Sequence, residues 1–199
     1  MTPHLIASVA ISLTLLISGC APQEGEEYFP LERDGDHREY SVMFLAPTVG
    51  VLKGRMATRI DGTETINGNK YLKQVEVISG LPEFPANFTY FRRDKKGIHI
   101  IDGDGNTKTE YTAIPFPLKV GTSWTVRNPN DYRQYRAEGI ETLELFDRKY
   151  ERCLKVSYMG KSMEKSLKGY SYNCPGVGQI KKVIEVPGAW RMEFVLDKR

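Results

Sequence analysis

The sequence predicts an all-β protein, folded as one strongly curved antiparallel sheet or an incomplete barrel built from two related halves. Most of the chain after about residue 28 alternates polar with apolar residues and is rich in Val, Ile, Thr, Tyr and Phe, which is typical of half-buried strands. Turn-forming pairs such as Asp61-Gly62 and Asn67-Gly68 separate these runs. No segment keeps a 3.6-residue period, so no long helix is expected.

The expected strands follow one another at a spacing of about ten residues, as in an antiparallel meander with one buried face. In the first half of the chain they are 39–44, 50–60, 70–78, 88–92, 97–101 and 108–113. In the second half they are 123–127, 132–138, 141–146, 152–158, 169–172, 179–185 and 190–196.

An internal repeat suggests how the sheet is assembled. Phe29-Pro30-Leu31 recurs as Phe116-Pro117-Leu118. Blocks around Lys70-Tyr71 and Tyr90 are then echoed, in the same order, around Lys149-Tyr150 and Tyr172. We expect one domain, 28–199, made of halves 28–113 and 114–199. Chance similarity between two β-rich segments is the alternative.

The N-terminus resembles a bacterial lipoprotein signal peptide. Residues 1–20 contain no Lys, Arg, Asp or Glu, and the apolar run 5–17 is too short to span a bilayer as a helix. It ends in Ile17-Ser18-Gly19-Cys20, which resembles the lipobox in which the Cys is lipidated. We expect 1–19 to be cleaved, Cys20 to carry the lipid, and 20–27 to form a short polar tether. A buried N-terminal helix is the alternative, and the missing basic residue before the apolar run is a departure from the pattern.

The resemblance also implies a location. Ala21 follows the Cys, where enterobacterial lipoproteins held in the inner membrane have Asp. We therefore expect an outer-membrane lipoprotein facing the periplasm, with the membrane as its partner through the lipid. A net charge of +3 is too small to indicate nucleic acid as a partner.

Export places the other two cysteines in an oxidising compartment. Cys153 and Cys174 are expected to form a disulfide there. Two free buried thiols are the alternative. A zinc site is disfavoured because no His lies near either thiol in the sequence.

Signals of catalysis are scarce, and we expect neither an enzyme nor a cofactor. Outside the signal peptide the chain has only His37 and His99, and neither G-x-S-x-G nor H-E-x-x-H occurs. Asp102-Gly-Asp104-Gly-Asn106 opens like a calcium loop but lacks the later Gly and Glu. We therefore interpret it as a hairpin turn and predict no metal.

Two loops are candidates for recognition. Phe84 lies in a Pro-rich connection and is expected to be exposed. Arg92, Arg93, Lys95 and Lys96 form a basic hairpin tip, which would suit anionic headgroups or cell-wall polymers. Ordinary loop packing and solvated turns are the alternatives.

A longer pattern in the second half resembles a known family. It comprises 116–124 (FPLKVGTSW), 141–145 (ETLEL), 150–156 (YERCLKV) and 172–182 (YNCPGVGQIKK). The segment 114–186 is similar to uncharacterised bacterial exported proteins and lipoproteins with "PL-G-W" and "PGVG-VK" signatures. The resemblance implies a β-rich exported domain with no established activity. Cys174 stands where the family usually has Ala, so the predicted disulfide does not follow from the resemblance.

Two function classes remain at this stage. The first is a non-enzymatic interaction or envelope-assembly role, whose mark would be a filled interior and an exposed apolar patch. The alternative is binding or carriage of a hydrophobic or lipid ligand in the curve of the sheet, whose mark would be an underfilled interior.

Overall fold

The computed structural model describes residues 23–81, 84, 86–102, 109–128, 131–162 and 164–198. The predicted signal peptide and Cys20 lie outside these residues. Within them, no helix is long and apolar enough to cross a membrane.

The described residues form one short 3-10 helix and twelve strands. In chain order they are η1 (Glu26–Tyr28), β1 (His37–Ala46), β2 (Gly50–Ile66), β3 (Asn69–Ser79), β4 (Asn87–Asp94), β5 (Gly97–Asp102), β6 (Tyr111–Pro115), β7 (Ser123–Asn128), β8 (Asp131–Leu145), β9 (Arg148–Ser162), β10 (Lys165–Cys174), β11 (Gly178–Val186) and β12 (Trp190–Lys198).

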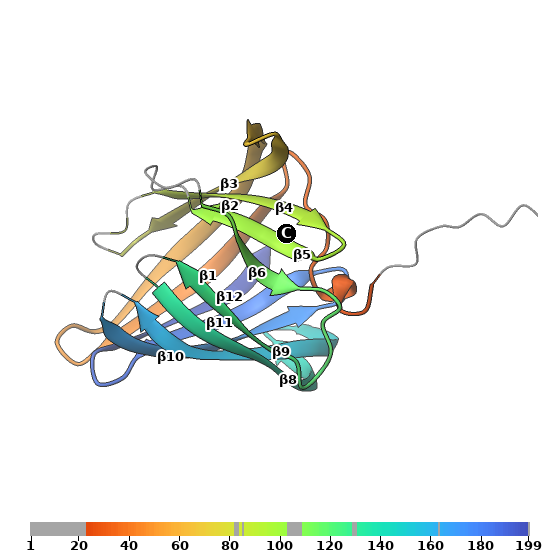
Figure 1. Ribbon diagram of the computed structural model, residues 1–199. Helices are drawn as coiled ribbons and strands as arrows, with labels where there is room; N and C mark the ends of the chain where they lie inside the picture. Colours follow the sequence, from red (N-terminus) through yellow and green to blue (C-terminus); the bar gives the residue numbers. More distant parts are fainter. Residues whose placement is uncertain are drawn as a thin grey trace, which may run out of the picture.

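All twelve strands belong to one antiparallel sheet, which confirms the predicted fold class. Its order is β6-β5-β4-β3-β2-β1-β12-β11-β10-β9-β8-β7, so the first and last strands pair in the middle of the sheet. The sheet curls until its two outermost strands, β6 and β7, approach each other (Figure 1). The result is a nearly closed barrel with a meander topology.

The strand count differs from the prediction at one place. Segments 132–138 and 141–146, expected as two strands, form the single strand β8. Gly139, in the gap between the two expected strands, lies at a bulge, where the pairing with β9 shifts its register and continues. The division between the halves also moves slightly, because β6 continues to Pro115. Each half contributes six strands, while the duplication itself stays a prediction.

Inward-facing side chains build the core. Tyr40 and Val42 of β1 pack with Met192 and Phe194 of β12 in the largest buried cluster. A second cluster around Phe116, Leu118 and Leu154 lies beside the approach of β6 and β7. The two copies of the Phe-Pro-Leu repeat meet at one end of the barrel, where the Phe29 and Phe116 ring centroids lie 6.4 Å apart. The copies are not equivalent, because Leu118 is buried and Leu31 is exposed.

The N-terminal segment 24–32, which includes η1, lies across this end of the barrel (Figure 1). The Glu24 carbonyl accepts a hydrogen bond from the Leu118 amide, and the Glu27 carbonyl accepts one from the Gly176 amide. Gly25 has φ +92°, and a Cβ there would clash with Leu118. The tether expected over 20–27 is therefore too long, because the chain is part of the folded domain from Glu24 onward.

The structure contains the predicted disulfide. Cys153 on β9 and Cys174 at the end of β10 are bonded to each other and fully buried. The bridge joins neighbouring strands just before the turn that leads into β11.

Candidate functional site

One candidate site is a cavity inside the barrel, with a volume of about 440 Å³. This volume falls in the range of small-molecule sites. Residues from nine strands line it: β1 to β6 and β10 to β12. On β4, β5 and β6 the wall is mostly apolar, formed by Phe91, Ile98, Ile100 and Ile114 beside Thr89. Phe29 of the N-terminal segment also lines it.

Two charged groups line this cavity from different parts of the sheet. Lys182 lies on β11 and Glu76 on β3, with β12, β1 and β2 between them in the sheet. The Lys182 ammonium lies 5.9 Å from the centre of the Phe194 ring, a distance at which a cation is attracted to the ring face. Among the ion pairs of the described residues, none within 4.0 Å joins Lys182 to Glu76.

The environment of Lys182 opposes its charge. Burial lowers the pKa of the Lys182 ammonium, which the negative charge of Glu76 partly offsets and the positive charge of Arg133 reinforces. Lys182 and Glu76 therefore influence each other through space without direct contact. A cavity with this arrangement offers a hydrogen-bond donor and an acceptor at separate points of its wall.

The other charges at the cavity are paired. Arg38 is buried, and its guanidinium lies 2.8 Å from a carboxylate oxygen of Glu32. The Tyr40 hydroxyl donates to the Gln179 carbonyl at 3.2 Å, and burial raises the Tyr40 pKa. Because Glu32 belongs to the N-terminal segment, the Arg38–Glu32 pair also fastens that segment over the cavity.

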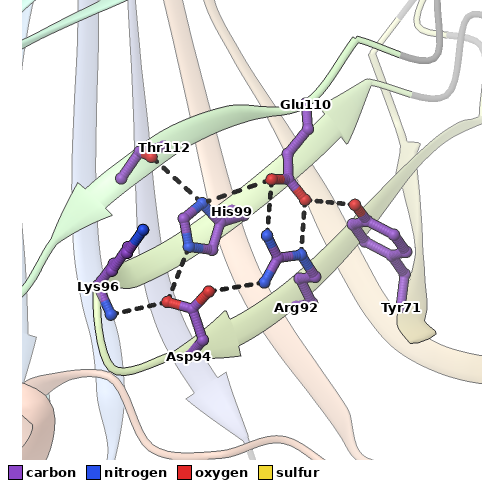
Figure 2. Close-up of polar contacts among 7 residues, drawn as sticks. All are labelled: Tyr71, Arg92, Asp94, Lys96, His99, Glu110 and Thr112. Atoms are coloured by element: carbon purple, nitrogen blue, oxygen red, sulfur yellow. Dashed lines mark hydrogen bonds and ion pairs between the residues drawn. The ribbon is translucent and has the colours of Figure 1, made fainter. Parts of the chain in front are cut away.

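A second polar group of residues lies away from the cavity wall, across β3 to β6 (Figure 2). We call Tyr71, Arg92, Asp94, His99, Glu110 and Thr112 the β3–β6 cluster. Arg92 holds Glu110 with two hydrogen bonds, of 2.6 and 2.7 Å, and Asp94 with one of 2.8 Å. The Tyr71 hydroxyl donates to the same Glu110 carboxylate.

His99 lies at the centre of this cluster and is buried. Its Nε2 lies 3.0 Å from Asp94 and its Nδ1 lies 3.2 Å from the Thr112 hydroxyl. Burial would raise the Asp94 pKa, but hydrogen bonds from His99, Arg92 and the Lys96 amide together lower it. The bond from Arg92 is the main cause of the lowered Glu110 pKa.

The order carboxylate–imidazole–hydroxyl is also that of a hydrolase triad. Here, however, none of the six residues lines the interior cavity. The contacts of His99 instead link β5 to its neighbours β4 and β6. Glu110, which precedes β6, reaches back to Arg92 of β4 and Tyr71 of β3. The arrangement is suited to holding the edge of the sheet. Among the described residues, no group of three His, Cys, Asp or Glu side chains could hold a metal ion.

The structure separates the predicted recognition residues. Phe84 is 39% exposed, and Lys95 and Lys96 at the β4–β5 turn are exposed too. Arg92 belongs to the β3–β6 cluster, and Arg93 pairs with Glu26 at 2.8 Å. Of the four basic residues, the two lysines remain available to a partner, while the two arginines make internal contacts.

Other residues considered in the sequence have ordinary surroundings. His37 contacts Glu39 at 3.1 Å, and Lys168 contacts Glu185 at 3.2 Å. Asp102 accepts a hydrogen bond from the Tyr111 hydroxyl at 2.9 Å. The rest of the calcium-like loop, including Asp104, lies outside the described residues.

Sequence reasoning missed the charges inside the barrel and the partners of His99. A usable signal existed for the cluster, since a two-residue turn at Lys95-Lys96 places Arg92 opposite His99. Lys182 gave a weaker signal. It follows Lys181, and only one of two successive strand residues can face inward.

No known family model matches the chain, and no curated protein matches it either. Among solved structures, the chain is similar to a predicted exported protein with a YmcC-like fold from Bacteroides fragilis. The TM-score is 0.50 at 12% identity, over 84% of this chain and 96% of that one. This likeness shows the fold.

Two further solved structures are more distant. A predicted lipoprotein from Parabacteroides distasonis matches with a TM-score of 0.41 at 12% identity, over 86% of this chain and 97% of that one. LprF from Mycobacterium bovis matches with a TM-score of 0.28 at 10% identity, over 80% of this chain and 84% of that one. These scores are too low to support an argument.

Proposed function

We propose that this protein is a lipid-anchored protein of the cell envelope that binds a small hydrophobic or amphipathic ligand inside its barrel and catalyses no reaction. The observation that carries the proposal is the interior cavity of about 440 Å³. A barrel built only as a scaffold would fill its interior with side chains, as small barrels do. The exported character of the similar protein from Bacteroides fragilis supports the envelope location.

The position of the anchor fits this role. Cys20 precedes Glu24 by four residues, and an extended chain covers at most about 3.5 Å per residue. With lipid on Cys20, the barrel end that carries segment 24–32 stays within about 14 Å of the membrane surface. Phe29 and Pro30 of that segment line the cavity. A ligand arriving from the membrane would thus meet the nearest end of the barrel.

The location can be tested with the lipidation residue. We propose an outer-membrane position facing the periplasm, because Ala21 follows Cys20. Cells expressing the natural chain should show it in the outer-membrane fraction, and Cys20→Ser should release it into the soluble or inner-membrane fraction. Recovery of both forms in the same fraction would contradict anchoring through Cys20.

The ligand can be tested by native mass spectrometry of residues 21–199, exported to the periplasm without the lipidation Cys. We expect a reproducible additional mass that organic solvent extracts. Ile100→Trp, which fills the cavity, should abolish it. Ile140→Trp, on an exposed residue of β8 that does not line the cavity, should keep it. A bare protein mass, together with no uptake of added amphiphiles, would contradict a ligand-binding function.

A second candidate is docking of an envelope partner, and a specific observation favours it. Leu45, Val49 and Val51 at the β1–β2 turn are 43%, 54% and 54% exposed, and Leu45 and Val51 are paired across the two strands. This turn lies at the opposite end of β1 from the N-terminal segment. A photo-crosslinker at Val49 should capture one defined envelope protein if this surface docks a partner, while the same group at Met159 should not.

A further inference from the structure

We infer that the ligand of the interior cavity carries both a positive and a negative charge at its polar end, joined to a single apolar chain. The inference rests on the proposed function and specifies its ligand class. The geometry that carries it is the pair Lys182 and Glu76, which line the same cavity from β11 and β3 without touching each other.

The charges of the pair need compensation when an apolar chain displaces water. An ammonium or a carboxylate removed from water without a partner is costly. While water fills the cavity, it can solvate both groups. A ligand that excludes water must therefore offer an anionic group to Lys182 and a cationic donor to Glu76.

Ligands with one charge fit less well. An anion alone would satisfy Lys182 but leave Glu76 desolvated, and a cation alone would do the reverse. Arg38 supplies no further positive charge, since Glu32 neutralises it at 2.8 Å. Arg133 lies over the ring of Tyr158, 5.8 Å from its centre, and acts on Lys182 only through space.

The rest of the cavity accounts for the apolar part of the ligand. Phe91, Ile98, Ile100 and Ile114 form a continuous wall on three neighbouring strands, and none of them offers a hydrogen-bonding side chain. A cavity of about 440 Å³ is the size of a drug-like molecule, which favours one chain over two. The ligand class is therefore a single-chain zwitterionic amphiphile.

The test uses four probes with one dodecyl chain and different heads. These are dodecyl phosphoethanolamine, dodecyl phosphate, dodecylammonium and 1-O-dodecylglycerol, each below its critical micelle concentration. Binding to the delipidated chain 21–199 is measured by titration calorimetry. We expect the zwitterion to bind at least about tenfold more tightly than the other three, since a hydrogen bond to a charged group contributes about that factor.

Three variants identify the groups responsible. Lys182→Met should weaken the zwitterion about tenfold and leave the glycerol probe unchanged. Glu76→Gln should weaken the ammonium-bearing probes and strengthen the phosphate probe. Lys149→Met removes an exposed lysine paired with Glu151 at 2.8 Å outside this cavity, and it should change nothing.

The outcomes separate the two proposals. Equal affinity for all four probes would overturn the zwitterion inference, and so would tightest binding of dodecyl phosphate, which carries only negative charge. Either result would leave the ligand-binding function standing. Failure of all four probes to bind would overturn the ligand-binding function itself. The probe series on the natural chain decides the question even if a cavity variant does not fold.

Discussion

The indole Nε1 of Trp124 donates a hydrogen bond to the carbonyl oxygen of Ala113 at 2.8 Å. Trp124 lies on β7 and Ala113 on β6, the two outermost strands of the sheet. Among the described residues no ladder pairs these strands. A side chain thus supplies a link between the edges where the backbone does not, and the Trp124 ring stacks on Tyr135, with centroids 5.2 Å apart.

Trp124→Phe should loosen this closure. Phenylalanine keeps most of the stacking on Tyr135 and loses the donor, so the free energy of unfolding should fall by about 1 kcal/mol. Urea denaturation measures that loss, and hydrogen exchange should show faster opening of β6. Trp190→Phe, at the start of β12 in the middle of the sheet, serves as the control and should not affect β6. Unchanged exchange in β6 for Trp124→Phe would show that the bond does not hold the edges together.

The strands were predictable because their signal is local. Alternating residues and turn pairs located most strands to within a few positions. The strand β2 continues to Ile66, past the expected end at 60, and Lys108, the expected start of 108–113, lies outside the described residues. The break expected between strands 132–138 and 141–146 falls at Gly139. Glycine marks both turns and bulges, and only the pairing partner on β9 tells them apart.

The site was less predictable because it depends on the register. A bulge at Ile180 shifts the pairing of β11 with β10, and one added residue exchanges the inward and outward faces. The sequence alone therefore does not reveal whether Lys181 or Lys182 faces inward. Glu110 posed a different problem, because it reaches Arg92 from outside any strand.

Acid should destabilise the protein partly through the β3–β6 cluster. The folded-state pKa of Asp94 lies below its unfolded value of about 3.9, so the unfolded chain binds more protons in acid. The stabilisation is complete above about pH 4 and is lost as the pH falls through the folded-state value. The pKa of Glu110 is also lowered in the folded state, so protonation of Glu110 in acid destabilises the protein in the same way.

Asp94→Asn tests this contribution. The variant should be less stable than the natural protein at pH 7. The difference should shrink as the pH falls from about 4 toward 2, because Asp94 takes up a proton in the unfolded natural chain while it is still ionised in the folded one. Urea midpoints measured across this range give the comparison. Asp61→Asn, at an exposed pair with Arg59, is the control and should give a small difference at every pH. A constant difference for Asp94→Asn would refute the electrostatic explanation.

The disulfide should account for a large part of the stability. The Cys153–Cys174 bridge closes a loop with a sequence separation of 21, and a loop of this size contributes roughly 3 kcal/mol in the chain-entropy model. Cys153→Ala with Cys174→Ala should lower the free energy of unfolding by about that amount, measured in urea. A reductant should destabilise the natural protein and leave the double variant unchanged. Equal sensitivity of both to the reductant would contradict a structural disulfide.

Arg93 should hold the N-terminal segment over the cavity. Its guanidinium pairs with Glu26 at 2.8 Å, donates to the Phe29 carbonyl at 2.7 Å, and lies 4.9 Å from the centre of the Phe116 ring. Arg93→Met should lower the free energy of unfolding by about 1.5–3 kcal/mol and speed hydrogen exchange in segment 24–32.

The matched control for Arg93 is Lys95→Met, two residues away at the exposed β4–β5 turn, which should leave both quantities unchanged. Since Phe29 and Pro30 line the cavity, Arg93→Met should also release a bound amphiphile faster than the natural chain. Stopped-flow displacement of dodecyl phosphoethanolamine measures that rate. A faster-exchanging segment with an unchanged release rate would show that the ligand does not leave past this end of the barrel.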